Sequence, residues 1–303
     1  MGRIRPTPLG MVLPEAPSKL VKGTDEGGVS MASTERHCRT AARVTVEDGV
    51  RHYHWDVESL MSVVDLCPPT LVRDVFKGRA YWFGYAFKPD SHPRDRRAFL
   101  EDIKGLGQDV IPAGYLRRFI NAPLALLNEQ VNLATIDFFV YPVSGRSPLV
   151  NRIIEQVDEW TSHEIEGASL ELVKRPPSEI GFDWEKFDRR YAPENRNIRD
   201  NRYEQMRAYV EDQLLPTIHA GRYFSLAKYV KMRYRPYITN FLSFDERQAE
   251  QYGRLRDARG ASVLVVDDVN TSGSTLNEIL RMLGRLNPSL EVYVFTLVGK
   301  PES

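Results

Sequence analysis

Two adjacent acids and a run of small hydroxyl residues lie near the C-terminal end of the sequence. Residues 263–266 are Val-Leu-Val-Val, and they are followed by Asp267, Asp268 and, at residues 270–275, Asn-Thr-Ser-Gly-Ser-Thr. Carboxylates can accept hydrogen bonds from two vicinal sugar hydroxyls. Backbone N–H groups at the start of a helix, helped by hydroxyl side chains, can bind a phosphate group. This pattern therefore predicts a site for a sugar phosphate such as ribose 5-phosphate.

The strand before the acids and the helix after them would bring these groups together. Gly273 permits a tight turn before a helix that we expect at residues 275–286. Open α/β sheets bind ligands at the carboxyl ends of their strands, which is where this strand delivers the acids. P-loop nucleotide triphosphatases also have an apolar strand that ends in acids, but the sequence lacks GxxxxGK[ST]. A receiver domain is excluded because only 36 residues (303 minus 267) follow Asp267.

Apolar runs alternate with amphipathic segments through the second half of the sequence. One helix is expected from Pro148 to about Trp160, and another at residues 275–286. The expected strands, rich in β-favouring residues, lie at residues 134–141, 170–174, 263–266 and 292–298. Strands that alternate with helices predict an α/β fold with a mostly parallel sheet flanked by helices.

We predict three parts along the chain. Residues 1–42 are rich in proline and glycine, which predicts a flexible leader. Residues 43–130 predict an N-terminal α+β region with a hairpin around Asp48-Gly49. Residues 131–303 form the α/β domain, into which residues 176–250 insert a helical segment. The other expected elements are a strand at residues 79–87 and helices at residues 57–64, 95–103, 115–127, 203–215 and 223–232.

Composition restricts the classes of function. The sequence has 41 Lys and Arg against 41 Asp and Glu, so its formal net charge is zero and no nucleic-acid partner is expected. The two cysteines, Cys38 and Cys67, lie in no CxxC pattern, which disfavours a disulfide framework or a structural zinc site. No apolar stretch approaches the roughly 18–20 residues of a membrane span. We therefore expect a cytoplasmic protein without a membrane partner.

Residues 263–275 resemble the phosphoribosyl-diphosphate signature of the type I phosphoribosyltransferases. That signature is an apolar strand, an acid pair, two variable residues and then Thr/Ser-Thr/Ser-Gly-x-Thr. The resemblance implies the fold of that family, and it implies that Asp267 and Asp268 contact the ribose 2- and 3-hydroxyls. It also implies that the 5-phosphate is held by Asn270, Thr271, Ser272, Gly273, Ser274 and Thr275.

Two further loops lie where the family binds the diphosphate. Ser144, Gly145 and Arg146 follow one expected strand, at the place of the family's diphosphate-binding loop. Lys174 and Arg175 follow the next strand, at the place of a mobile catalytic loop that is often basic. The resemblance implies that Arg146 and either Lys174 or Arg175 stabilise the departing negative charge. The expected catalytic residues are these three together with Asp267 and Asp268.

The resemblance implies an Mg²⁺-dependent transferase that moves ribose 5-phosphate from phosphoribosyl diphosphate to an unidentified small acceptor and releases diphosphate. Mg²⁺ would be bound through the substrate, with Asp267 and Asp268 as candidate contacts. Asn270 occupies the position of an acid in the 6-oxopurine enzymes, which argues against hypoxanthine or guanine as the acceptor. Homodimers are common in the family, and residues 43–130 would be its acceptor-binding hood. The alternative is a non-catalytic sensor of phosphoribosyl diphosphate or of a nucleotide, because the family includes such members.

Overall fold

The computed structural model describes most of the chain between Arg43 and Gly299. The chain divides into two units, Met1–Arg36 and His37–Ser303, and all of the described residues belong to the second. The expected leader and both cysteines lie outside the described residues. Those residues are 43–47, 50–54, 64–65, 72–76, 78–87, 92–107, 111–144, 147–161, 168–192, 200–270 and 272–299.

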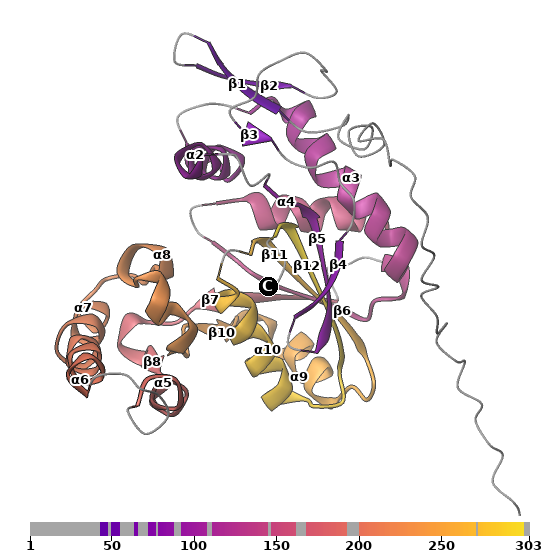
Figure 1. Cartoon of the computed structure of the whole chain (residues 1–303). Coiled ribbons are helices and arrows are strands. Elements are labelled where there is room, and N and C mark those ends of the chain that lie inside the picture. Colours follow the sequence, from indigo (N-terminus) through magenta and orange to yellow (C-terminus); the bar gives the residue numbers. More distant parts are fainter. Residues whose placement is uncertain are drawn as a thin grey trace, which may run out of the picture. The chain divides into compact units, whose positions relative to one another are not determined.

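A seven-stranded sheet forms the centre of the second unit (Figure 1). Its five middle strands are parallel, and an antiparallel strand closes each edge. The mostly parallel sheet expected from the sequence is therefore confirmed. In spatial order the strands are β10 (Leu242–Phe244), β7 (Ser169–Lys174), β6 (Phe138–Pro142), β11 (Ser262–Val269), β12 (Glu291–Val298), β5 (Arg79–Tyr85) and β4 (Val72–Phe76).

Helices cover both faces of this sheet. On β11, Val263 and Val265 belong to one core cluster, while Leu264 and Val266 belong to the cluster on the opposite face. A strand buried on both faces needs apolar residues at every position, which explains the continuous Val-Leu-Val-Val run. Helices α9 (Ala249–Asp257) and α10 (Ser274–Leu286) cover the first face, and α2 (Pro93–Ile103), α3 (Ala113–Val131) and α4 (Leu149–Asp158) cover the second.

Strand β5 joins the N-terminal region to the central sheet. It pairs in parallel with β12, with Tyr81 opposite Val294. On the second face of the sheet the ring of Tyr85 stacks on Phe119 of α3 at a centroid separation of 4.1 Å. The sequence analysis assigned this strand to a separate N-terminal region, whereas its hydrogen bonds place it in the same sheet as the C-terminal strands. Local sequence cannot reveal such a pairing, because β12 follows more than 200 residues later.

Short helices fill the chain between β7 and β11. Phe187 is fully buried at their centre, where its ring contacts Tyr191, Tyr203, Tyr234 and Tyr237. A π-helical turn, Val210–Leu214, joins two of the helices. The helices are α5 (Trp184–Tyr191), α6 (Asp200–Tyr209), α7 (Leu215–His219) and α8 (Leu226–Tyr229), with 3-10 turns at Pro177–Glu179, Met232–Tyr237 and Glu246–Gln248 and a strand pair β8 (Gly181–Phe182) and β9 (Ile238–Thr239).

Three expected elements differ in extent from the structure. The helix expected at residues 223–232 is only α8, because the backbone is extended at its C-cap, Val230. The strand expected at residues 134–141 begins at Phe138, because Asn132 adopts a left-handed conformation and a 3-10 turn, Leu133–Thr135, follows it. Residues 64–65, expected to end a helix, form β3 (Val64–Asp65), and residues 57–63 lie outside the described residues.

The N-terminal hairpin is confirmed. Strands β1 (Arg43–Glu47) and β2 (Val50–His54) pair antiparallel, with Glu47 opposite Val50 across the expected turn, and β3 pairs with β1. In the part of the chain that the structure describes, no helix combines the length and the apolar character needed to cross a membrane.

Candidate functional site

Strand β11 carries the two acids to the carboxyl edge of the sheet. Asp267 and Asp268 are buried, with 6% and 9% of their surfaces exposed. The Oδ1 atom of Asp267 accepts a hydrogen bond from the backbone N–H of Asp268 at 2.9 Å. Burial, and then the negative charge of Asp268, raise the pKa of the Asp267 carboxyl above its usual range, although Lys104 opposes this shift. The pair thus places two carboxyl groups side by side in a largely buried position, where hydroxyl donors or cations would be attracted.

The turn after the acids begins helix α10. Gly273 has a φ of 66°, a left-handed conformation that is costly for residues with a side chain. The Oγ atoms of Ser272 and Ser274 lie 3.1 Å apart, and the N–H of Asn277 donates to the Gly273 carbonyl at 2.8 Å. The N–H groups of the first helical turn, before Asn277, have no acceptor within the helix. This turn can therefore donate several hydrogen bonds to an anion.

Asp267 and the turn line one hollow that is open to solvent. Its empty volume is about 180 Å³, and it is lined by Asp267, Val269, Asn270 and residues 272–276. Hydroxyl side chains and the first N–H groups of α10 border this hollow, so its chemistry suits a phosphate group. Thr271, which the sequence analysis also assigned to the phosphate, lies outside the described residues.

The side chain of Asn270 is held by the central sheet. Its Nδ2 atom donates to the hydroxyl of Tyr81 at 3.1 Å, and that hydroxyl lies 2.9 Å from Oγ1 of Thr296. All three residues are buried, and the backbone N–H of Asn270 donates to the Val298 carbonyl at 2.9 Å. The structure thus gives Asn270 an anchoring contact that sequence reasoning did not anticipate: it fixes the turn to strands β5 and β12.

Tyr81→Phe should destabilise the protein through this chain of hydrogen bonds. The substitution keeps the ring but leaves the buried amide donor of Asn270 without its acceptor, at a cost of about 1–3 kcal/mol in the free energy of unfolding. Urea denaturation measures the difference. Tyr223→Phe is the matched control, because Tyr223 is 39% exposed, and it should change stability by less than about 0.5 kcal/mol. An unchanged unfolding midpoint for Tyr81→Phe would show that the hydrogen bond between Asn270 and Tyr81 does not stabilise the protein.

A lysine that sequence reasoning did not select reaches the acid pair. Lys104 is the C-cap of α2, and its Nζ atom lies 2.7 Å from Oδ2 of Asp268. The two side chains are 26% and 13% exposed. In sequence, 164 residues (268 minus 104) separate the partners, so no local pattern could identify this contact. Only the packing of α2 on the sheet brings the ammonium to the site.

The connections between strands diverge on the two sides of the acid pair. After β6 the chain passes through α4 to β7, whereas after β11 it passes through α10 to β12, on the opposite side. Ligands of open α/β sheets bind outside the carboxyl ends of the strands at such a switch point. The carboxyl ends of β6 and β11 are therefore where the topology expects a ligand.

The loop after β6 is described only at its two ends. Ser144 and Ser147 form an isolated antiparallel bridge. The Oγ atom of Ser147 accepts a hydrogen bond from the N–H of Leu149 at 3.4 Å, where α4 begins. Gly145 and Arg146 lie outside the described residues. The assignment of this loop to diphosphate stays a prediction.

Lys174 ends strand β7 beside β10, and Arg175 follows it. The Nε atom of Arg175 donates to the Leu242 carbonyl at 3.0 Å, and its Nη1 atom donates to Glu179 at 2.9 Å. Lys174 lies opposite Leu242 in the strand register, and its side chain is exposed. These two contacts tie Arg175 to its own neighbourhood, and neither of them joins it to the acid pair.

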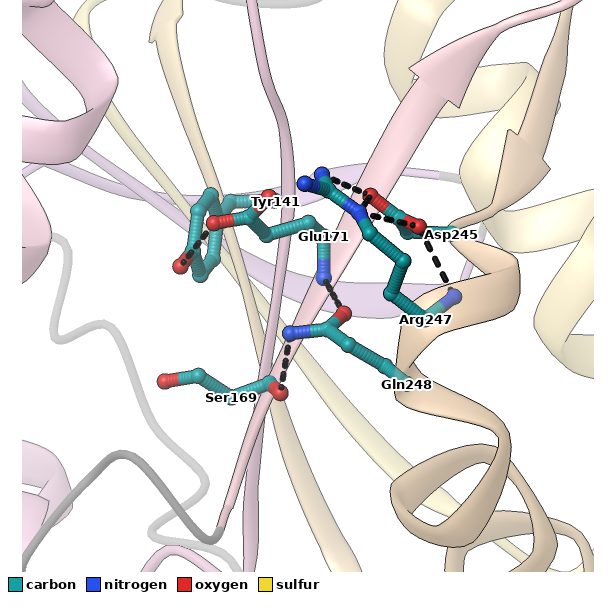
Figure 2. A network of polar contacts seen from close by, with 6 residues as sticks. All are labelled: Tyr141, Ser169, Glu171, Asp245, Arg247 and Gln248. Carbon is teal, nitrogen blue, oxygen red and sulfur yellow. Dashed lines mark hydrogen bonds and ion pairs between the residues drawn. The ribbon is translucent and has the colours of Figure 1, made fainter.

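A second polar cluster links β7 to the segment after β10 (Figure 2). Gln248 accepts from the N–H of Glu171 at 2.7 Å and donates to the Ser169 carbonyl at 3.3 Å. Arg247 donates to both carboxylate oxygens of Asp245, at distances from 2.5 to 3.0 Å. The Arg247 side chain, and then its backbone N–H, lower the pKa of Asp245 to about 2. These contacts attach the edge strand to the sheet.

Arg247→Met should reduce the sensitivity of the protein to acid. The pKa of Asp245 is lower in the folded state than its ordinary value of about 3.9. Its contribution to stability is therefore present above about pH 4 and is lost as the pH falls towards about 2. Without the guanidinium the folded-state pKa rises, so the variant should lose less stability in this window. The denaturant midpoints of the wild type and the variant, measured across this pH window, test the expected difference.

The background for this comparison is Asp245→Asn, which has no carboxyl to titrate at that position. Adding Arg247→Met to Asp245→Asn should leave the pH dependence unchanged. If the single variant Arg247→Met, which retains Asp245, loses as much stability in acid as the wild type, the ion pair between Arg247 and Asp245 does not cause the acid sensitivity.

The C-terminal portion of the chain matches a known family. Residues 231–303 match the family model described as the phosphoribosyl transferase domain. The matched residues include β10, β11, α10 and β12, and thus the acid pair and the turn. No curated protein matches the chain. In its C-terminal portion, residues 231–303, the chain therefore carries a phosphoribosyl transferase domain, as the resemblance of residues 263–275 led us to expect.

Proposed function

We propose that the protein binds phosphoribosyl diphosphate and transfers its ribose 5-phosphate to a small acceptor, with release of diphosphate. One observation carries this proposal. Asp267 of the buried acid pair and the N-terminal turn of α10 line the same hollow, inside the portion that matches the family. A diol acceptor beside a phosphate-binding turn is the arrangement that a ribose 5-phosphate group requires.

Each part of the hollow has a role in this proposal. The backbone N–H groups at residues 274–276 and the hydroxyls of Ser272, Ser274 and Thr275 bind the 5-phosphate. Asp267 and Asp268 accept hydrogen bonds from the ribose hydroxyls. The expected reaction builds positive charge at the ribose C1 atom as diphosphate departs. Two carboxylates fixed at the edge of the same sugar stabilise that charge electrostatically.

The residues at the site fit a magnesium ion that is held mainly by the substrate. Carboxylate oxygens are the ligands that Mg²⁺ prefers, and it commonly uses one or two of them together with phosphate oxygens and water. Among the described residues no three His, Cys, Asp or Glu side chains gather into a metal site, so Asp267 and Asp268 offer a partial ligand set. When bound, the ion would neutralise charge on the departing diphosphate.

Calorimetry of the full chain with phosphoribosyl diphosphate and Mg²⁺ tests the binding step. A screen for diphosphate release, over nitrogenous bases and other small acceptors, tests the transfer. We expect binding, and release with at least one acceptor. Binding without release for any acceptor would support a sensor instead. The absence of binding would contradict the assignment of the site. The screen would identify the acceptor, and the homodimer stays a prediction.

A further inference from the structure

We propose that Lys104 is a substrate-binding residue, and that its ammonium contacts the diphosphate of phosphoribosyl diphosphate. This inference rests on the proposed function and adds to it a cation from the N-terminal half of the chain. Lys104, the C-cap of α2, lies outside residues 231–303, the portion that matches the family.

The ammonium of Lys104 is placed to serve both the acid pair and a ligand. An ammonium has three N–H donors. Asp268, 2.7 Å away, is its ion-pair partner among the described residues. The lysine side chain is 26% exposed, so solvent and ligands can reach it. At least one donor is therefore available to an anion that binds beside Asp268.

The backbone that carries Lys104 is firmly held. Gly105 follows with a φ of 67°, and the N–H groups of Leu106 and Gly107 both donate to the Glu101 carbonyl, at 2.8 and 3.0 Å. Gly107 packs so closely on the buried Asp102 that a Cβ atom there would lie 1.7 Å from its Oδ1. A lysine at the end of such a turn can direct its ammonium with little loss of backbone entropy.

The same turn lies beside the loop expected to bind diphosphate. A Cβ atom placed on Gly105 would lie 4.0 Å from Cδ of Pro148, the residue that precedes α4. Lys104 thus contacts Asp268 at the end of β11, and the next residue, Gly105, lies beside Pro148 at the end of the β6–α4 connection. The first contact lies at the carboxyl end of β11, and the second belongs to the connection that leaves the carboxyl end of β6. The topology expects the ligand between these two strand ends.

Charge balance favours a cation at this position. Phosphoribosyl diphosphate is a polyanion, and Asp267 and Asp268 would repel its diphosphate at short range. Arg175 is bonded to Glu179 and the Leu242 carbonyl. Among the described residues, Lys104 is the cation that forms an ion pair with Asp268. It can therefore offset the charge of Asp268 and attract the diphosphate at the same time.

Lys104→Met, compared with Arg97→Met, tests this inference. Arg97 lies on the same helix but is 81% exposed and paired with Glu101. Calorimetry with Mg²⁺ should use phosphoribosyl diphosphate, ribose 5-phosphate and inorganic diphosphate as separate probes. We expect Lys104→Met to weaken the binding of phosphoribosyl diphosphate and of inorganic diphosphate by about tenfold or more, as for a lost charge-assisted hydrogen bond. The affinity for ribose 5-phosphate should fall by less than about threefold.

Each other outcome has a distinct meaning. If Lys104→Met weakens all three probes equally, Lys104 acts only by ordering Asp268 and the inference fails. If it weakens none, the inference also fails. Lys104→Arg should recover part of the preference for diphosphate, and a failure to recover any part would count against a direct contact. If the wild-type protein binds none of the probes, the proposed function itself fails.

Discussion

Replacing both Asp267 and Asp268 by Asn should lower the rate of phosphoribosyl transfer by about 10²–10³-fold or more, as expected when preorganised electrostatic groups are removed from a reaction centre. Asn has the shape of Asp and keeps an oxygen that can accept the N–H of residue 268, so the turn should keep its geometry. What the variant loses is negative charge beside the ribose. Initial rates of diphosphate release give the measurement once an acceptor is known, and calorimetry gives the loss of binding before that.

The double variant should remain folded, and the physical reason lies in the pKa of Asp267. Burial raises this pKa, so the charged carboxylate opposes folding as the pH rises above the ordinary carboxyl range near about 4. A neutral amide removes that cost at neutral pH. Asp257→Asn is the matched control, because this acid lies at the end of α9 with a 67% exposed side chain. Normal turnover by the double variant would show that the acid pair is not the site.

Phe119→Ala should cause the largest loss of stability among these variants, about 3–5 kcal/mol in the free energy of unfolding. Phe119 is fully buried on α3. Its ring stacks on Tyr85 of β5 and packs edge-on against Phe99 of α2, with centroids 4.1 and 5.7 Å away. Truncation leaves a cavity where two helices and the sheet meet. Urea denaturation measures the loss.

The position of Phe119 also predicts a functional effect. Because Phe99 and Lys104 share α2, a cavity beside Phe99 should loosen the helix that carries the lysine to Asp268. Binding of inorganic diphosphate should then weaken in Phe119→Ala at a temperature where the protein is still folded. Leu106→Ala is the control, since Leu106 is 49% exposed and should change stability by less than about 0.5 kcal/mol. A loss below about 1 kcal/mol for Phe119→Ala would contradict the packing argument.

Local sequence was sufficient to predict those strands and turns whose conformation is determined by residues close together in the chain. The Val-Leu-Val-Val run predicts a strand buried on both faces, and β11 is such a strand. Gly273 predicts a tight turn before a helix, and its left-handed φ and helix α10 confirm it. The hairpin around Asp48-Gly49 follows from the alternation on both sides of a turn dipeptide.

Contacts between distant segments could not be predicted in this way. The pattern of residues 79–87 indicates a strand but not its partner, which is β12. Lys104 looks like an ordinary lysine at a helix end until α2 packs on the sheet and brings it to Asp268. Asn270 has the right position for a phosphate turn, yet its amide is bonded to Tyr81, 189 residues away in sequence. The candidate site therefore combines a predictable motif with anchors that only the tertiary structure supplies.

The place of β12 in the sheet has a consequence for how the protein is made. This strand lies between β11 and β5 in the sheet, yet Thr296 of β12 is synthesised 215 residues after Tyr81 of β5. Nascent β5 can pair with β4, which precedes it, but its other edge leaves the exit tunnel long before its parallel partner β12 exists. Such non-local topologies fold slowly and expose surfaces prone to aggregation. We expect chaperones to shield this part of the nascent chain until β12 emerges and fills the sheet.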